Sequence, residues 1–350
     1  MFLPLLVVST LLLAGIPCIQ AQRIDTHIHA LPQAYLDAQE AAGGDPTGTP
    51  TPSWSIDATM ASMDSVNSSI AILSVSAPGV PIAGTGRKAR QLARTLNAYL
   101  GNISTDTLLR KQFGFFGSLP DWEDVDGTLV EIDYLFGQQK LCSGVVVFTT
   151  YGDKLLGHRK FVPIWKKLQQ YKALVFIHPT LLAITPKLIG AGIPQPITDF
   201  LLATTRTVVD LVMTGTVRSC PDVDIVLSHA GGTIPFVGTR AIGGLLVPAV
   251  AAKASVTFTQ AAEDFGRFYY DIALSTSPAQ LDGLLDWSKP GKILFGSDFP
   301  FAPSIGIASV LSSYNGFVEN NARGQQLAPE VLRANALSLL NKHSLGRHFS

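Results

Sequence analysis

The chain lacks an excess of charge of either sign, since 26 Lys and Arg residues balance 26 Asp and Glu residues. A protein that binds a phosphate backbone needs clustered basic residues, so nucleic acid is excluded as the main partner. Cysteine is also scarce. Cys18, Cys142 and Cys220 form no CxxC pair, which excludes a disulfide scaffold, a zinc ribbon and a dithiol redox motif. We expect Cys142, at the start of an apolar run, to be a buried free thiol.

Charged side chains are absent from the first 21 residues, which are apolar from Phe2 to Ile16. This pattern predicts a secretory signal peptide over residues 1–21 and a mature chain over residues 22–350. The protein would then enter the secretory pathway and be secreted, retained in the endomembrane system or delivered to a vacuole. A signal anchor and a misassigned start codon are the alternatives. Two N-glycosylation sequons fit a secreted glycoprotein, and they begin at Asn67 and Asn102.

Eight short runs of β-branched and aromatic residues alternate with longer segments of helical period. This alternation is typical of repeated βα units, and it predicts one α/β domain, a (β/α)8 TIM barrel, over residues 22–350. The predicted strands span residues 23–30, 69–77, 113–119, 143–149, 174–179, 224–230, 268–274 and 292–298. The predicted helices span residues 56–66, 86–101, 127–139, 161–171, 198–218, 234–256, 278–287 and 327–342.

Two segments are too irregular for simple βα turns. Residues 31–54 are rich in Gly, Pro and Thr, and residues 180–196 carry Gly190 and Gly192 between prolines. Because barrel enzymes keep long loops over the carboxyl ends of their strands, we expect both segments to cover a substrate site.

Titratable side chains stand at the carboxyl ends of several predicted strands. His27 and His29 are two residues apart on one strand, so both imidazoles point to the same side. His178, His229 and Asp298 end three further strands, and in a closed barrel these ends converge on one mouth. Imidazoles together with one carboxylate suit Zn²⁺, with Mn²⁺ or iron as alternatives. We therefore expect one metal ion per chain, with zinc as the first candidate.

The segment Arg23 to His29 resembles the DxHxH opening of the metal-dependent amidohydrolase superfamily. The run VVVFTT at the end of the fourth predicted strand lacks the lysine of the two-metal members. The motifs His178-Pro179, HAGG from His229 and GSDFP around Asp298 resemble the nonoxidative decarboxylase branch that contains aminocarboxymuconate semialdehyde decarboxylase. The loop from Gly43 to Ser55, followed by Met-Asp, is similar to that of fungal 6-methylsalicylate decarboxylases.

The resemblance implies a mononuclear site with His229 as an unligated acid/base. In the decarboxylation that we expect, Asp298 is a second candidate proton donor or relay. It also implies that Arg240 reaches the substrate carboxylate of a neighbouring subunit, which predicts a homodimer. An arginine of the semialdehyde decarboxylase has no counterpart in residues 31–54, so that enzyme's dicarboxylate substrate is disfavoured. The metal ligands that the resemblance implies are His27, His29, His178 and Asp298.

The function expected from this resemblance is zinc-dependent nonoxidative decarboxylation of an ortho-hydroxybenzoate. The expected substrate is 6-methylsalicylate, which would give m-cresol, or a closely related polyketide-derived aromatic acid. Flat aromatic side chains suit a flat ring, so Trp54, Phe148, Phe299 and Phe301 are candidates for the pocket wall, with Trp54 and Phe299 as substrate contacts. The alternative is a metal-dependent hydrolase of a lactone, ester or amide, since the same site could activate water. A noncatalytic secreted metal-binding protein is the third possibility.

Overall fold

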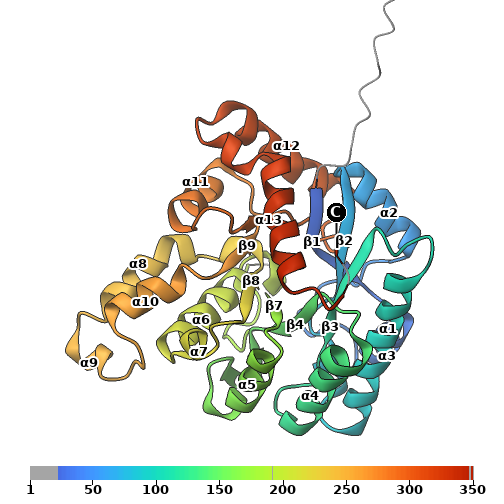
Figure 1. The fold of residues 1–350 in the computed structure, drawn as a ribbon, viewed down its shortest axis with the longest axis horizontal. Coiled ribbons are helices and arrows are strands. Elements are labelled where there is room, and N and C mark those ends of the chain that lie inside the picture. The colour runs from blue at the N-terminus through green and yellow to red at the C-terminus, as the bar shows by residue number, and fades with distance from the viewer. Residues whose placement is uncertain (1–22, 191, 347, 350) are drawn as a thin grey trace, which may run out of the picture.

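The computed structural model describes residues 23–190, 192–346 and 348–349, so the predicted signal peptide lies outside the described residues. Eight parallel strands form one sheet in the order β1-β2-β3-β4-β7-β8-β9-β10, with helices around it (Figure 1). The sheet closes where Asp25 and Phe295 form a parallel bridge between its first and last strands. There the amide of Thr26 donates to the carbonyl of Phe295 over 3.0 Å. The predicted (β/α)8 barrel is confirmed.

All eight predicted strands are present. They are β1 (Arg23–Ala30), β2 (Ser68–Val75), β3 (Phe113–Ser118), β4 (Gly144–Phe148), β7 (Leu174–His178), β8 (Asp224–Leu227), β9 (Tyr269–Asp271) and β10 (Ile293–Leu294). A short antiparallel hairpin, β5 (Thr150–Tyr151) and β6 (Lys154–Leu155), follows β4. The last three barrel strands end earlier than predicted. The chain leaves the extended conformation there, with φ of 52° at His229, 53° at Leu274 and 63° at Asp298.

The outer layer consists of thirteen α-helices and six short 3-10 or π segments within the described residues. The α-helices are α1 (Gln33–Ala41), α2 (Ile56–Ser65), α3 (Arg87–Thr105), α4 (Val125–Ile132), α5 (Val162–Gln170), α6 (Asp199–Met213), α7 (Thr216–Ser219), α8 (Ile234–Gly244), α9 (Pro248–Ala251), α10 (Phe258–Phe265), α11 (Pro278–Trp287), α12 (Ser304–Asn320) and α13 (Pro329–Lys342). The short segments are η1 (Val80–Ala83), η2 (Asp133–Gln139), η3 (Arg159–Phe161), η4 (Gln195–Ile197), η5 (His229–Gly231) and η6 (Gly324–Leu327).

Two predicted helices are interrupted in the structure. The helix expected over residues 198–218 becomes α6 and α7, because Gly215 adopts the left-handed conformation that ends a helix. The helix expected over residues 234–256 becomes α8 and α9, since Val247 is held extended before Pro248. The sequence analysis did not predict α1, α10 or α12. The first of these occupies the beginning of the segment taken as a loop over residues 31–54.

The amino ends of the strands are closed by α13 and the C-terminal residues. Side chains at the starts of the strands, such as Ile24 and Leu174, share one buried cluster with Leu339, Leu340 and Phe349. Because parallel strands are covered on both faces, they read as continuous apolar runs. The carboxyl ends of the strands, where the predicted metal ligands lie, form the opposite mouth. Within the described residues, no helix combines the length and apolar character that crossing a membrane requires.

Asp224 ties α13 to the barrel. Its carboxylate accepts hydrogen bonds from Lys342 Nζ over 2.6 Å and from His343 Nε2 over 2.8 Å. The other ring nitrogen of His343 donates to the carbonyl of Lys172 over 2.6 Å. Burial opposes ionisation of Asp224, but the hydrogen bonds from His343 and Lys342 outweigh burial and lower its pKa to about 2.

We expect Asp224→Asn to lower the free energy of unfolding by about 2 kcal/mol at pH 7, because the charge-assisted hydrogen bonds are weakened. A depressed carboxyl pKa contributes stability above the unfolded value, so the difference between wild type and variant should shrink as pH falls from about 4 to about 2. Urea unfolding across this range measures the effect. Asp222→Asn, at an exposed carboxylate nearby, is the control. A difference that stays constant down to about pH 2 would contradict the ionic contribution.

Candidate active site

Five buried side chains from four strands of the barrel meet at its mouth. His27 and His29 alternate along β1, and His178 is the last residue of β7. His229 lies two residues after the end of β8, and Asp298 lies four residues after the end of β10. All five are less than 10% exposed. The structure thus brings together the residues that the sequence analysis placed at strand ends.

Four of these residues form a compact set of potential metal ligands. The Nε2 atoms of His27 and His29 lie 3.2 Å apart. Asp298 Oδ1 lies 3.3 Å from His27 Nε2 and 3.1 Å from His29 Nε2. With His178 included, the ligand atoms all lie within 4.8 Å of one another. One ion can therefore contact three imidazoles and one carboxylate at the same time.

The far ring nitrogens fix how these imidazoles face the centre. His178 Nδ1 lies 2.8 Å from the carbonyl of Pro179, and since a carbonyl only accepts, this nitrogen carries the hydrogen. His27 Nδ1 lies 3.0 Å from Asp271 Oδ2, and His29 Nδ1 lies 3.1 Å from Ser74 Oγ. The Nε2 atoms of the three rings thereby face the same point, as in metal sites with oriented histidine ligands.

The charge states of the set suit a divalent cation. Burial, followed by the neighbouring His29, holds the pKa of His178 well below its usual range, so this imidazole is neutral. Burial opposes ionisation of Asp298, but hydrogen bonds from His27 and His29 keep its pKa well below normal. Burial also opposes protonation of His27, yet Asp271 and Asp298 raise its pKa to about 10. A cation held by the His27 ring would therefore take the place of a proton on that ring.

His229 stands beside the four ligands rather than among them. Its ring centroid lies 4.7 Å from that of His27, and its Nδ1 lies 3.1 Å from the carbonyl of Ala273. Because Nδ1 donates to this carbonyl, Nε2 presents a lone pair in the neutral ring. Burial, and then the charge of His27, lowers the pKa of His229. The ring is thus held in one orientation with Nε2 available for proton transfer.

Asp271 is a positioning residue that the sequence analysis missed. It ends β9, and its Oδ2 accepts from His27 while its Oδ1 accepts from the amides of His229 and Ala273 over 3.1 and 3.0 Å. One carboxylate thus orients both a potential metal ligand and the candidate acid/base. The only sequence signal was a single acidic residue in the apolar run FYYDIAL.

We expect Asp271→Asn to weaken metal binding by about 10- to 100-fold, because an amide is a poorer acceptor for the His27 N–H and orients the ring less firmly. Competition with a chromogenic chelator measures the metal affinity. Asp153→Asn, at an exposed carboxylate, is the control. Unchanged affinity in a folded Asp271→Asn protein would mean that the carboxylate does not support the ligand set.

Three of the four potential ligands, His29, His178 and Asp298, line a cavity of about 310 Å³, a size that suits a single-ring acid. The described residues that line it include no Lys or Arg. Its polar lining consists of His29, His178, His229, Asp298, Asp45, Thr47, Thr49, Ser76, Ser275 and Gln280. Its apolar lining consists of Ala77, Pro194, Pro196, Ile197, Phe200, Leu201, Leu274 and Phe301. Both segments expected to cover the site, residues 31–54 and 180–196, contribute to this lining.

The aromatic residues predicted for the pocket wall are only partly in place. Phe301 lines the cavity, with its ring centroid 5.7 Å from that of His29. Trp54 packs against Tyr99 just before α2 and does not line it. Phe148 is buried and does not line it either. Trp54 and Phe148 thus lie outside the cavity lining, and their contact with a substrate stays a prediction.

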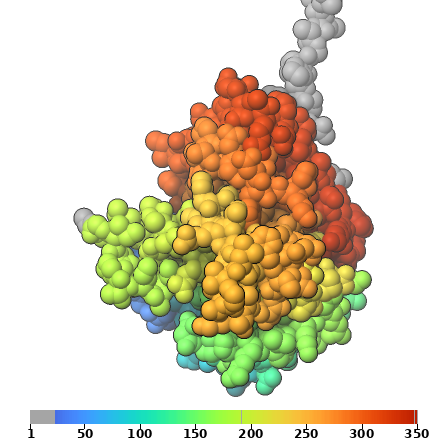
Figure 2. Space-filling view, turned by 90° about the vertical axis from the view of Figure 1, so that its left-hand side faces the viewer, coloured from blue at the N-terminus to red at the C-terminus, as the bar shows by residue number. Residues whose placement is uncertain are grey.

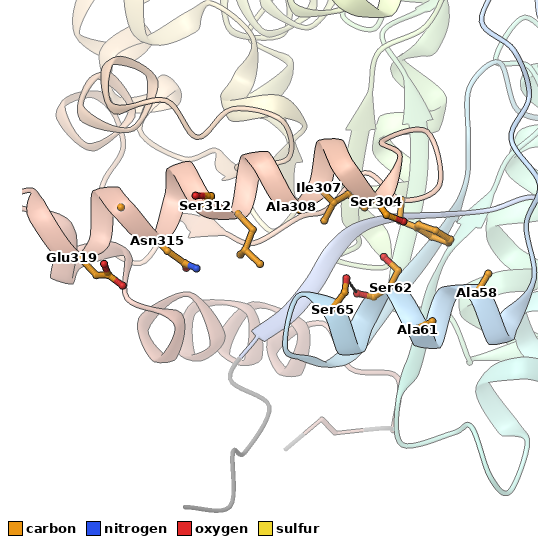
Figure 3. A pocket seen from close by; sticks show the side chains of 13 residues that line it. Ala58, Ala61, Ser62, Ser65, Ser304, Ile307, Ala308, Ser312, Asn315 and Glu319 are labelled. Atoms are coloured by element: carbon orange, nitrogen blue, oxygen red, sulfur yellow. Dashed lines mark hydrogen bonds between the residues drawn. The ribbon is translucent and has the colours of Figure 1, made fainter.

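Phe299 lines a different hollow, a groove of about 760 Å³ between α2 and α12 (Figure 3). The positive φ of Asp298 reverses the chain, so the carboxylate and the next side chain diverge. In Figure 3, Ser62 and Ser65 of α2 face the α12 side chains across the groove. None of the five buried histidine and aspartate side chains at the mouth of the barrel lines this groove. Arg240 is exposed on α8 and does not line the cavity of its own chain.

Comparison with known proteins places these observations in a family. The amidohydrolase family matches residues 24–341. The 6-methylsalicylic acid decarboxylase acuB of Aspergillus aculeatus is 38% identical over 324 residues, which are 91% of this chain and 95% of that protein. Decarboxylase yanB of Aspergillus niger is 35% identical over 334 residues, which are 92% of this chain and 88% of that protein.

Among solved structures, a 5-carboxyvanillate decarboxylase from Novosphingobium aromaticivorans matches with a TM-score of 0.77 and 17% identity. The match covers 91% of this chain and 96% of that one, which was solved with manganese and 4-hydroxy-3-methoxy-5-nitrobenzoic acid. At this identity the similarity establishes the fold alone. The family match and the fungal relatives together show that the chain belongs to the amidohydrolase family and that it has decarboxylases as homologues.

Proposed function

We propose that this protein is a metal-dependent nonoxidative decarboxylase of an ortho-hydroxybenzoate, with 6-methylsalicylate as substrate and m-cresol and carbon dioxide as products. The observation that carries the proposal is the cavity. Three imidazoles and one carboxylate meet at the wall of a space sized for one ring, in a chain 38% identical to a 6-methylsalicylic acid decarboxylase. Since no Lys or Arg among the described residues of the same chain lines this space, a metal ion would supply counter-charge to a substrate carboxylate within the chain's own site.

The donor set fits one divalent ion, with His27, His29, His178 and Asp298 as the residues that would hold it. Three nitrogens and one oxygen suit Zn²⁺, which is the metal that we propose. Mn²⁺ is the second candidate, because a structural relative binds manganese. A bound cation would supply counter-charge to the carboxylate and phenolic oxygens of the substrate.

The chain's own residues supply the proton and the dry environment. Phe301, Phe200 and Leu201 line the cavity beside the ligand set and exclude water from the ring. His229, held through Nδ1 by the carbonyl of Ala273, takes up a proton from solvent at Nε2, with Asp298 as the candidate relay, and donates it to the ring carbon that bears the carboxylate. The bond to the carboxylate carbon then breaks, its electron pair restores aromaticity, and carbon dioxide leaves.

The direct test is release of carbon dioxide and m-cresol from 6-methylsalicylate by the purified chain over residues 22–350, loaded with zinc or with manganese. Metal-dependent release supports the proposal. If one metal ion binds per chain and no ortho-hydroxybenzoate is decarboxylated, the proposal is wrong, and a screen of lactones, esters and amides follows.

We also propose that the enzyme is a homodimer in which Arg240 serves the partner's site. Arg240 lies one helical turn from Phe236 on α8, and Phe236 is 66% exposed. Further exposed apolar side chains follow in the chain, and they are Leu246, Val247, Val250 and Phe258. The part of the surface that α9 and α10 form faces the viewer in Figure 2. Apolar side chains gathered in this way are typical of protein interfaces.

For this interface we expect Phe236→Asp to give monomers in light scattering, because a buried unpaired charge opposes association. Arg240→Ala should keep the dimer and raise KM at least about 10-fold, since a charged contact to the substrate is lost. Arg323→Ala, at an arginine paired with Asp286 on α11, is the control. A wild-type monomer with full activity would contradict the shared site.

The secretory route also remains a proposal. Of the two sequon asparagines, Asn102 is exposed on α3, whereas Asn67 is half-buried. N-terminal sequencing of protein made in a secreting host tests cleavage after Ala21, and the mass of the same sample tests glycosylation.

A further inference from the structure

The charges around the cavity are unevenly arranged. Its lining contains two carboxylates, those of Asp298 and Asp45, and no Lys or Arg among the residues that the structure describes. Asp298 belongs to the ligand set. Asp45 comes from the segment between α1 and α2, which carries no basic residue. This second carboxylate is not needed to hold a metal, so its place beside a site for anionic substrates requires another explanation.

Asp45 is held in a fixed position. Its Oδ1 accepts hydrogen bonds from the amide and from the hydroxyl of Thr47, each over 2.7 Å. Thr47 is buried and lies 2.9 Å from the hydroxyl of Thr49, and Thr51 donates to Gln39 of α1 over 2.9 Å. The carboxylate therefore cannot swing freely out of the way when a ligand enters.

A fixed negative charge at this position discriminates between ligands by their charge. A bound metal ion would balance the first carboxylate of a substrate, but a second one would meet Asp45 with no Lys or Arg of the same chain, among the described residues, lining the cavity. At an effective dielectric constant of about 20, two like charges about 8 Å apart repel strongly enough to weaken binding by roughly 30-fold. Neutral substituents of the same size carry no such penalty.

We propose that Asp45 is a specificity residue that rejects a second carboxylate, so that the site accepts aromatic acids with a single carboxylate. The inference rests on the decarboxylase function proposed above and names its substrate class. In this proposal the segment between α1 and α2 selects substrates by their charge, and the residues at the strand ends carry out the reaction.

The test compares salicylates that carry either a carboxylate or a carboxamide at each remaining ring position, because the two groups match in size and differ in charge. Binding to the metal-loaded protein is measured by calorimetry and kcat/KM by carbon dioxide release. We expect wild type to bind at least one carboxamide about 10-fold or more tightly than its matching carboxylate. Asp45→Asn should abolish this difference in affinity between carboxamide and carboxylate, and Asp45→Glu should preserve it.

Glu40→Gln is the matched control, since it removes one negative charge at an exposed position at the end of α1 and should leave the affinity difference unchanged. An undiminished affinity difference in Asp45→Asn, or no affinity difference in wild type, would overturn the role of Asp45. Binding is read independently of turnover, so salicylates that bind without release of carbon dioxide would overturn the decarboxylase alone. Failure of every salicylate to bind would overturn both proposals.

Discussion

Replacing His229 with alanine is expected to lower kcat for carbon dioxide release by about 10²- to 10⁴-fold while the metal content stays at the wild-type level. The reason is geometric. His229 lines the cavity, its Nδ1 donates to the carbonyl of Ala273, and it lies outside the group of four ligands. Its loss removes the positioned proton donor but leaves the ligand atoms in place. Steady-state and single-turnover kinetics, with metal analysis of the same sample, measure the effect.

His348→Ala is the matched control, because His348 is exposed and distant in sequence from the strand ends. We expect it to retain wild-type kcat. An additional variant, His229→Gln, keeps a side chain of similar size without an ionisable ring and should be as slow as the alanine variant. If either His229 variant keeps kcat within a few-fold of wild type with metal bound, His229 only packs against His27 and another group delivers the proton.

Removing the metal is expected to abolish turnover and to destabilise the fold. Without the cation, the cavity has no counter-charge for a substrate carboxylate among the described residues, and the carboxylate of Asp298 stays buried. A metal ion at about 100-fold above its Kd adds about 2.7 kcal/mol to the free energy of unfolding. Dialysis against a chelator, followed by activity assays and thermal unfolding, measures both effects.

Adding back zinc and manganese separately identifies the ion that restores kcat. The control is His158→Ala, which removes an imidazole that caps η3 away from the cavity and should not change metal content. His178→Ala should bind the metal more weakly, since it deletes one of the ligand-capable groups. Full turnover by protein with no detectable metal would contradict the proposed chemistry.

Much of the barrel could be predicted because parallel strands are buried on both faces. Each strand then reads as a short apolar run, and eight such runs alternating with helical segments leave few other folds. The ends of the elements were less predictable. β8 and β10 end two and four residues before His229 and Asp298, which both adopt a positive φ. The surrounding structure imposes this conformation on residue types that usually avoid it.

The gathering of His27, His29, His178 and Asp298 was predictable because barrel topology brings strand ends together, whatever their separation in sequence. The contact between His27 and Asp271 was not, since it joins residues 244 positions apart and depends on the register between β8, β9 and β10. The misplaced aromatic residues have a similar cause. Whether Phe299 or Phe301 enters the cavity depends on the turn after β10, and residue type alone does not determine this direction.

The sequence by itself determined the fold class, the strand order and the kinds of side chain at the mouth of the barrel. These follow from periodicity and from the convergence of parallel strand ends, which are local properties of the chain. Tertiary structure alone decided which nitrogen of each imidazole faces the centre, that Asp271 supports His27, and that Asp45 reaches the cavity while Trp54 does not. These outcomes depend on contacts between distant segments, whose geometry is set only when the whole barrel packs.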